Sequence, residues 1–260
     1  MDIRSPMAHF RHKDGARSYR VCYLREPRDF SRPKESMHAD EGKFVLQPNG
    51  APGSAPLENA GDEFILQSSE EQARARFYSL MAALLLAPPS AELLHALANA
   101  DPIAGETGDL ESAWEQLVLV AGIMDAEAVR EEFDALFVST GTPLINPHAS
   151  LYLSGFMMDR PLSALRDTLR ELGLARQASA VELEDHLGSL FETMALLIAQ
   201  GRSLTIQSEV FNAHIGSWIE RCLDDIRETP GANFYRTLTD VVEAFYRVEI
   251  QAFGIETMSK

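Results

Sequence analysis

The residues best suited to chemistry lie together at one point of the chain. The stretch VELEDHLGSLFETMALLIAQ, residues 181–200, places Glu184, Asp185 and His186 directly before a run of apolar residues with helical spacing. Two carboxylates beside an imidazole suit three kinds of site: a general acid–base centre, a metal site, or the polar rim of a binding groove. The rest of the sequence has to decide between them.

Catalytic and metal sites need further residues that the sequence does not supply. There is no G-x-S-x-G elbow, no phosphate-binding glycine loop and no H-E-x-x-H pattern, and neither Cys22 nor Cys222 has a neighbouring base. A metal ion would need three or four ligands, but His148 and His214 stand singly in unrelated segments. We therefore expect no catalytic residue, no metal and no cofactor.

A purely structural role for the same residues is an open alternative. Ser179 followed by Glu182 fits a capping box, which predicts a helix over 180–201 with Asp185 and His186 in its first two turns. In that case the aspartate caps the helix and the histidine lies beside it. The expected buried face of this helix comprises Leu183, Leu187, Leu190, Phe191, Met194, Leu197 and Ile198.

Helical periodicity extends through the body of the chain. Expected helices run from Ser69 to the double proline at 88–89 and over about 90–100, 109–122, 125–138, 149–156, 160–173, 180–201, 205–228 and 232–253. No segment shows the bounded period-two alternation of a strand, and no internal repeat is present. The prediction is one all-α domain over 66–260, a helical bundle of about eight helices.

The first 65 residues differ from this body. They are rich in charge, proline and glycine without a sustained period, which predicts a disordered extension and linker over 1–65. The hexapeptide YRVCYL and the pentapeptide KFVLQ could each form a short strand, but neither has an obvious partner.

Charge restricts the possible partners. Residues 44–260 hold thirteen Lys/Arg against thirty-two Asp/Glu, a net charge near −19, whereas residues 1–43 hold ten against seven. An acidic body repels nucleic acid and anionic lipid and attracts basic partners. The longest apolar run, Leu80 to Ala87, is too short to span a membrane, and the N-terminus lacks the apolar centre of a secretory signal. We expect a cytoplasmic protein without stable membrane insertion.

A second segment could present side chains to a ligand. GTPLINPHASLYLSGFMMDRPL, residues 141–162, is a loop rich in proline and asparagine that leads into aromatic residues and two methionines. Methionine adapts to varied apolar peptides, so this segment suits binding, with packing into the core as the alternative. The later aromatic helices, which include Trp218 and Phe234 to Tyr246, are expected to be core.

In their order and spacing, these segments resemble the TorD family of redox-enzyme maturation chaperones, which includes the DmsD-type proteins. The resemblance covers about residues 70–253. It rests on VREEFDALF, the proline loop with SLYLSGFMM, LRDTLRELGL, EDHLGSLFETMALLIA, HIGSWIERCLDDI and NFYRTLTDVVEAF.

The resemblance implies a cytoplasmic, all-α chaperone that binds the catalytic subunit of a molybdenum-cofactor enzyme, commonly through its twin-arginine signal peptide, as a monomer or dimer. The peptide-binding positions that it suggests are Asp185, His186, Glu184 and Leu187, with Pro147 to Tyr152 as the opposite wall. Two departures from the family pattern stand out: Glu184 replaces a proline before the Asp-His pair, and the proline loop lacks a glutamate.

The residues themselves agree with a peptide groove. A twin-arginine peptide is cationic and then apolar, so its receptor needs carboxylates beside an apolar surface, and we expect guanidinium groups to bond Asp185 or Glu184. Two alternatives stay open. One is an assembly factor of the nitrate-reductase chaperone type for a subunit that is not exported. The other is a metal-dependent helical hydrolase using Glu182, Asp185 and His186.

Overall fold

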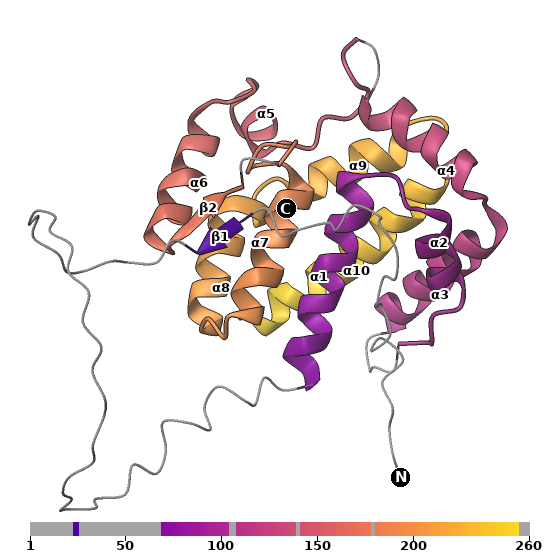
Figure 1. The fold of residues 1–260 in the computed structure, drawn as a ribbon, viewed down its shortest axis with the longest axis horizontal. Coiled ribbons are helices and arrows are strands. Elements are labelled where there is room, and N and C mark those ends of the chain that lie inside the picture. The colour runs from indigo at the N-terminus through magenta and orange to yellow at the C-terminus, as the bar shows by residue number, and fades with distance from the viewer. Residues whose placement is uncertain (1–22, 26–68, 104–107, 139–140, 178–179, 255–260) are drawn as a thin grey trace, which may run out of the picture.

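The computed structural model describes residues 23–25, 69–103, 108–138, 141–177 and 180–254. The described helices are α1 (Ser69–Leu86), α2 (Ala91–Ala98), α3 (Gly108–Ile123), α4 (Ala126–Phe133), α5 (Ala149–Ser154), α6 (Arg160–Glu171), α7 (Leu187–Ala199), α8 (Leu204–Phe211), α9 (Ile219–Glu228) and α10 (Phe234–Ala252) (Figure 1). The all-α prediction is confirmed. Most of the expected extension lies outside the described residues, so its disorder and the boundary at residue 65 stay predictions.

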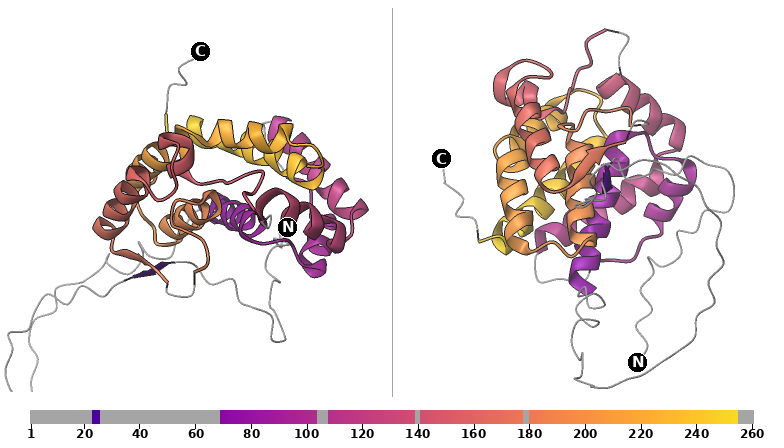
Figure 2. Two further views of the ribbon diagram at one scale, coloured as in Figure 1. Left: turned by 90° about the horizontal axis from the view of Figure 1, so that it is seen from above. Right: turned by 60° about the vertical axis from the view of Figure 1, so that its left-hand side comes forward.

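The helices are arranged around α1 and α7, which pack along each other. Seen from above, α9 and α10 form a layer on one side of this pair (Figure 2). Helix α7 is buried over most of its length because its face of large apolar residues is backed by small ones such as Gly188 and Ala195. A β-carbon at position 188 would lie 2.6 Å from Leu86 Cγ, so the close approach of α1 requires the glycine.

A buried polar network joins α1, α8 and α10. The Arg74 guanidinium donates to both carboxylate oxygens of Glu249, at 2.7 and 2.6 Å, and to the side-chain oxygen of Gln207 at 3.2 Å. The Tyr78 hydroxyl donates to the same carboxylate at 2.9 Å. Since Glu249 is fully buried, these bonds replace the water that its charge has lost.

The start of α10 is capped by a carboxylate from α4. Glu132 accepts hydrogen bonds from the backbone amides of Asn233, Phe234 and Tyr235 at 2.8 to 3.1 Å. Asn233 makes no side-chain cap bond of its own, so the distant glutamate replaces a local N-cap. This contact fixes the last helix against the first half of the domain.

The helix expected over 180–201 begins later than predicted. Helix α7 starts at Leu187, and its N-cap is His186. The capping box at 179–182 is wrong as a helix start, because the Arg176 guanidinium binds the carbonyl oxygens of Ala180 and Glu182 and keeps these residues out of a helix. Asp185 and His186 therefore precede the helix and, contrary to the prediction from the sequence, do not lie in its first two turns.

Two other expected helices are interrupted. The segment expected as a helix over 205–228 is α8, a π-helical turn at Asn212–Gly216, and α9. The segment expected over 125–138 is α4 followed by a π-helical turn at Asp134–Val138. These interruptions leave the apolar periodicity nearly unchanged, so periodicity alone did not reveal them.

One two-stranded ribbon is present among the described residues. Strand β1 (Tyr23–Arg25) pairs antiparallel with β2 (Leu174–Arg176), directly after α6. The sequence offered part of YRVCYL as a strand but gave it no partner. None of the described helices is both long and apolar enough to cross a membrane.

Candidate functional site

Asp185 is fully buried and caps α5, a helix that lies elsewhere in the chain. Its Oδ2 accepts a hydrogen bond from the backbone amide of Ser150 at 2.9 Å. Its backbone carbonyl oxygen accepts one from the amide of Ala149, also at 2.9 Å. The residue before α5, His148, makes no side-chain cap bond. Asp185 thus supplies the cap of α5 from 35 residues away along the chain.

His186 is the N-cap of α7 and is buried as well. Its Nδ1 accepts the amide of Gly188 at 3.0 Å, which requires an unprotonated Nδ1 and leaves the proton of the neutral ring on Nε2. Burial, aided by the neighbouring His148, lowers the pKa of His186 to about 3. The imidazole therefore stays neutral at physiological pH, and the mild-acid response that a histidine beside carboxylates could give is not expected of it.

His148 lies across from His186 and joins the motif to the proline loop. The two rings meet edge to face, with centroids 5.0 Å apart, and the backbones form an isolated bridge. His148 Nδ1 lies 2.6 Å from Asn146 Oδ1, and its Nε2 lies 3.6 Å from a Glu182 carboxylate oxygen. The nearby His148 lowers the pKa of Glu182 despite partial burial, so this carboxylate is ionised.

The Glu184 carboxylate is turned inward and pairs with another side chain of the same protein. The Arg166 guanidinium on α6 donates to both of its carboxylate oxygens, at 3.0 and 2.9 Å. Burial raises the pKa of Glu184, but the bonds from Arg166 outweigh it, and the net effect is a lowered pKa. This fork holds α6 against the motif.

The remaining predicted residues complete the same junction. The amide of Leu187, a fully buried residue, donates to the carbonyl of buried Pro147 at 2.8 Å. Tyr152 stacks on Trp218 with ring centroids 5.2 Å apart, and its hydroxyl donates to Asp225 at 2.7 Å. The predicted site residues therefore lie where α5, α6, α7 and α9 come together, in a largely buried junction rather than along an open groove, and the ring and hydroxyl of Tyr152 contact α9.

Large apolar side chains are exposed immediately beyond this junction. We call Leu153, Phe156, Met157 and Met158 the apolar hook; Phe156 is 72% exposed and Met158 69%. The left-handed Gly155 ends α5, and Met158 also has a positive φ of 58°, so the chain turns sharply and carries these side chains outward. Of the two interpretations of this segment, exposure favours binding over core packing.

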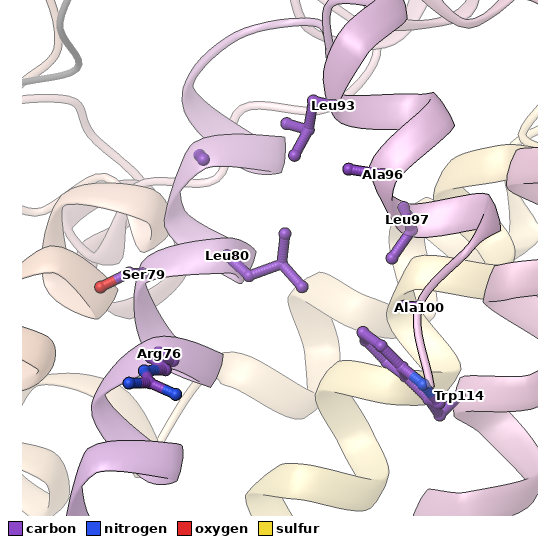
Figure 3. Close-up of a pocket in the computed structure, with 9 residues that line it drawn as sticks. Arg76, Ser79, Leu80, Leu93, Ala96, Leu97, Ala100 and Trp114 are labelled. Atoms are coloured by element: carbon purple, nitrogen blue, oxygen red, sulfur yellow. The ribbon is translucent and has the colours of Figure 1, made fainter. Parts of the chain in front are cut away.

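Among the hollows of the described residues, two apolar ones lie on either side of α1 and a third lies along α3. The first, about 320 Å³, lies between α1, α2 and α3, where Leu80, Leu93, Leu97 and Trp114 surround a common space (Figure 3). The second, about 260 Å³, lies between α1 and α7. Both are lined by Arg76, Ser79 and Ala83, and neither by a predicted site residue. Sequence reasoning missed them, although small residues at helical spacing on α1 were the available signal.

The fold that carries these features is all-α. The charged motif residues hold other parts of the chain, and no group of three or more His, Cys, Asp or Glu among the described residues could hold a metal ion. Residues 104–224 match the family model described as the nitrate reductase delta subunit. The matched model is that of the TorD-like family of chaperones for molybdoenzyme maturation, and it is consistent with the resemblance of the sequence to that family. That family consists of maturation factors and not of catalytic enzymes, so the match gives no support to a hydrolase.

Proposed function

We propose that this chaperone binds the catalytic subunit of its molybdoenzyme in the cytoplasm, before cofactor insertion and export, and that it recognises the twin-arginine signal peptide of that subunit. The observation that supports this best is the apolar hook, four large apolar side chains exposed within six residues. Exposed apolar clusters of this kind are typical of protein-binding surfaces. Two of the four are methionines, which repack at little cost around different apolar sequences.

The hook is attached to a rigid support. Helix α5 has only six residues and would be marginal alone, but Asp185 caps its start, and the Arg221 guanidinium donates to the Tyr152 carbonyl at 2.8 Å. A surface positioned in advance loses less conformational entropy when a partner binds. In this proposal the Asp-His motif acts by positioning the hook, and its buried carboxylates need not touch the peptide.

Carboxylates near the hook suit a cationic peptide. Asp159 follows the hook directly, and its bonds with the Arg160 amide and with Ser154 lower its pKa, so it stays ionised. Asp225 lies on the exposed surface of α9 and accepts a hydrogen bond from the Tyr152 hydroxyl. Its carboxylate is a second negative charge beside α5. An apolar surface with acidic neighbours matches a peptide that has two arginines and then an apolar segment.

Substitutions in the hook test the proposal. We expect the full-length double variant Phe156→Ser/Met158→Ser to bind a labelled twin-arginine signal peptide at least about tenfold more weakly, because two anchoring side chains are lost. The control is Ile123→Ser on α3, whose side chain is 74% exposed and lies outside the hook. Equal weakening in both variants, or in neither, would refute the hook as the binding surface.

A second experiment separates the signal peptide from the mature subunit. Co-purification of the catalytic subunit should fail when its signal peptide is deleted. Retained binding would instead favour an assembly factor that grips a subunit independently of export. Size-exclusion chromatography with light scattering on the same samples would show whether the chaperone acts as a monomer or a dimer.

A further inference from the structure

Strand β2 is held in its extended conformation by contacts that do not involve β1. Gly173, with a φ of 70°, turns the chain after α6, and Leu174 is buried in the core. On the other side, the Arg176 guanidinium donates to the carbonyl oxygens of Ala180 at 2.6 Å and Glu182 at 3.0 Å. β2 therefore presents a formed strand edge whether or not another strand is paired with it.

The chain's own N-terminal segment occupies this edge. Tyr23 pairs with Arg176, and Arg25 with Leu174, in an antiparallel ladder of three residues. Pro27 follows two residues later and has no backbone N–H to donate, so it limits extension of the ladder in that direction. A ribbon of this length has little stability of its own and can exchange its partner.

The occupying segment has the chemistry of an arginine-bearing peptide. Arg20, Arg25 and Arg28 lie within or beside β1 in the sequence. At the end of β2, the carboxylate of Glu182 is partly exposed and ionised, and the described body carries a large excess of acidic residues. An extended basic segment thus suits this edge in backbone hydrogen bonding and in charge.

The edge is linked to the junction that supports the hook. β2 packs against α6, and α6 packs against α5; these elements lie at the same end of the molecule (Figures 1 and 2). From β2 the chain continues through residues 177–183 to Glu184 and Asp185, which hold α6 and α5. An extended peptide segment on β2 would therefore lie at one side of the junction and the hook at the other.

We propose that the edge of β2 is a strand-addition site for the extended, arginine-bearing part of the client signal peptide, and that Tyr23–Arg25 occupies this site in cis as a competitor. The inference rests on the proposed function, since it concerns the same peptide. Binding of the client then requires displacement of β1. The apparent dissociation constant is then the intrinsic constant divided by the fraction of molecules in which β1 is unpaired.

The test is the full-length variant Leu24→Pro, in which the central residue of β1 can no longer be accommodated in the ladder. The matched control is Ala16→Pro, which places a proline in the same N-terminal region outside the paired residues. The readout is the dissociation constant of a labelled twin-arginine signal peptide. We expect Leu24→Pro to lower it about three- to tenfold and Ala16→Pro to leave it unchanged.

Two further measurements address the competitor directly. Hydrogen exchange of the β2 amides, without peptide, should be faster in Leu24→Pro than in the control. A synthetic peptide spanning residues 20–28 should displace the labelled signal peptide from the Leu24→Pro chain. Failure of this displacement would refute a shared site.

The outcomes separate the two proposals. Equal peptide affinity in Leu24→Pro and wild type refutes the competition and leaves the proposed function standing. Peptide binding by neither chain refutes the proposed function and the competition with it. In that case the hydrogen-exchange result still decides whether β1 pairs with β2 in solution.

Discussion

At the scale of single residues, the charged side chains in the middle of this chain serve mainly as caps and partners for distant backbone. Asp185 caps α5 and Glu132 caps α10, each from another element. His186 caps its own helix through an unprotonated ring nitrogen. The chemistry that carboxylates and imidazoles could do in an active site is used here to satisfy buried amides.

The pH dependence of stability tests the cap made by His186. Its folded-state pKa of about 3 lies below the unfolded value of about 6.5, so the unfolded state binds more protons between these values. The free energy of unfolding should be level above about pH 6.5 and fall by up to about 1.4 kcal/mol per pH unit below it. His186→Asn keeps a capping oxygen without a titrating group, so urea denaturation should show a shallower acid decline in this variant. Identical pH profiles would contradict the prediction.

The Glu132 cap predicts a large loss of stability for a single substitution. Glu132→Ala leaves three amides at the start of α10 without their acceptor and should lower the free energy of unfolding by about 2–4 kcal/mol. Glu131→Ala, at the exposed neighbouring position, should change it by less than about 0.5 kcal/mol. Urea denaturation measures both, and hydrogen exchange should show faster exchange at residues 233–235 only in the first variant.

At the scale of elements, the short helix α5 depends on its neighbours. Asp185→Ala should lower the free energy of unfolding by about 1–2 kcal/mol through loss of the cap, and should also weaken signal-peptide binding because the hook is displaced. Asp185→Asn keeps an oxygen for the Ser150 amide and should have a smaller effect on both. An exposed control, Asp167→Ala on α6, should alter neither. Unchanged peptide affinity in Asp185→Ala would show that the motif does not position the binding surface.

Helices α1, α8 and α10 are joined by the Arg74–Glu249 network. Because both charged groups are largely buried, we expect the loss of one partner to destabilise the fold more than the loss of both. Glu249→Met should lower the free energy of unfolding by about 3–5 kcal/mol, because it leaves a largely buried guanidinium without its partner. Arg74→Met/Glu249→Met removes both charges and should be more stable than the Glu249→Met variant. A double variant as unstable as the sum of the two single variants would contradict this interpretation.

At the scale of the whole molecule, charge should dominate recognition of the client. The acidic body attracts a cationic peptide over a distance set by screening, which is about 10 Å at 0.1 M salt. We expect the dissociation constant of a twin-arginine peptide to rise several-fold as sodium chloride increases from about 0.05 to about 0.5 M. The same peptide with both arginines replaced by glutamine should bind more weakly and with little salt dependence. Salt-independent binding of the original peptide would exclude electrostatic recognition.

The sequence by itself determined the all-α class, most helix positions and the place of the Asp-His motif. Apolar spacing of three and four residues is local, so it predicted α1, α3, α6 and α10 closely, and proline and glycine marked the ends of α1 and α6. The resemblance, and not this spacing, grouped Asp185 and His186 with the proline loop; in the structure Asp185 bonds Ser150 and His186 bridges His148, while a role of these residues in peptide binding stays a prediction.

Only the tertiary structure decided what these residues contact. Asp185 bonds Ser150, Glu184 bonds Arg166, and β1 pairs with β2 across about 150 residues of chain. No local pattern encodes such pairings, because each depends on where another element packs. The delayed start of α7 has the same cause, since Arg176 draws the preceding carbonyls away from the helix. Burial of the motif and exposure of the hook are likewise properties of the packed molecule, because both follow from which surfaces the other helices cover.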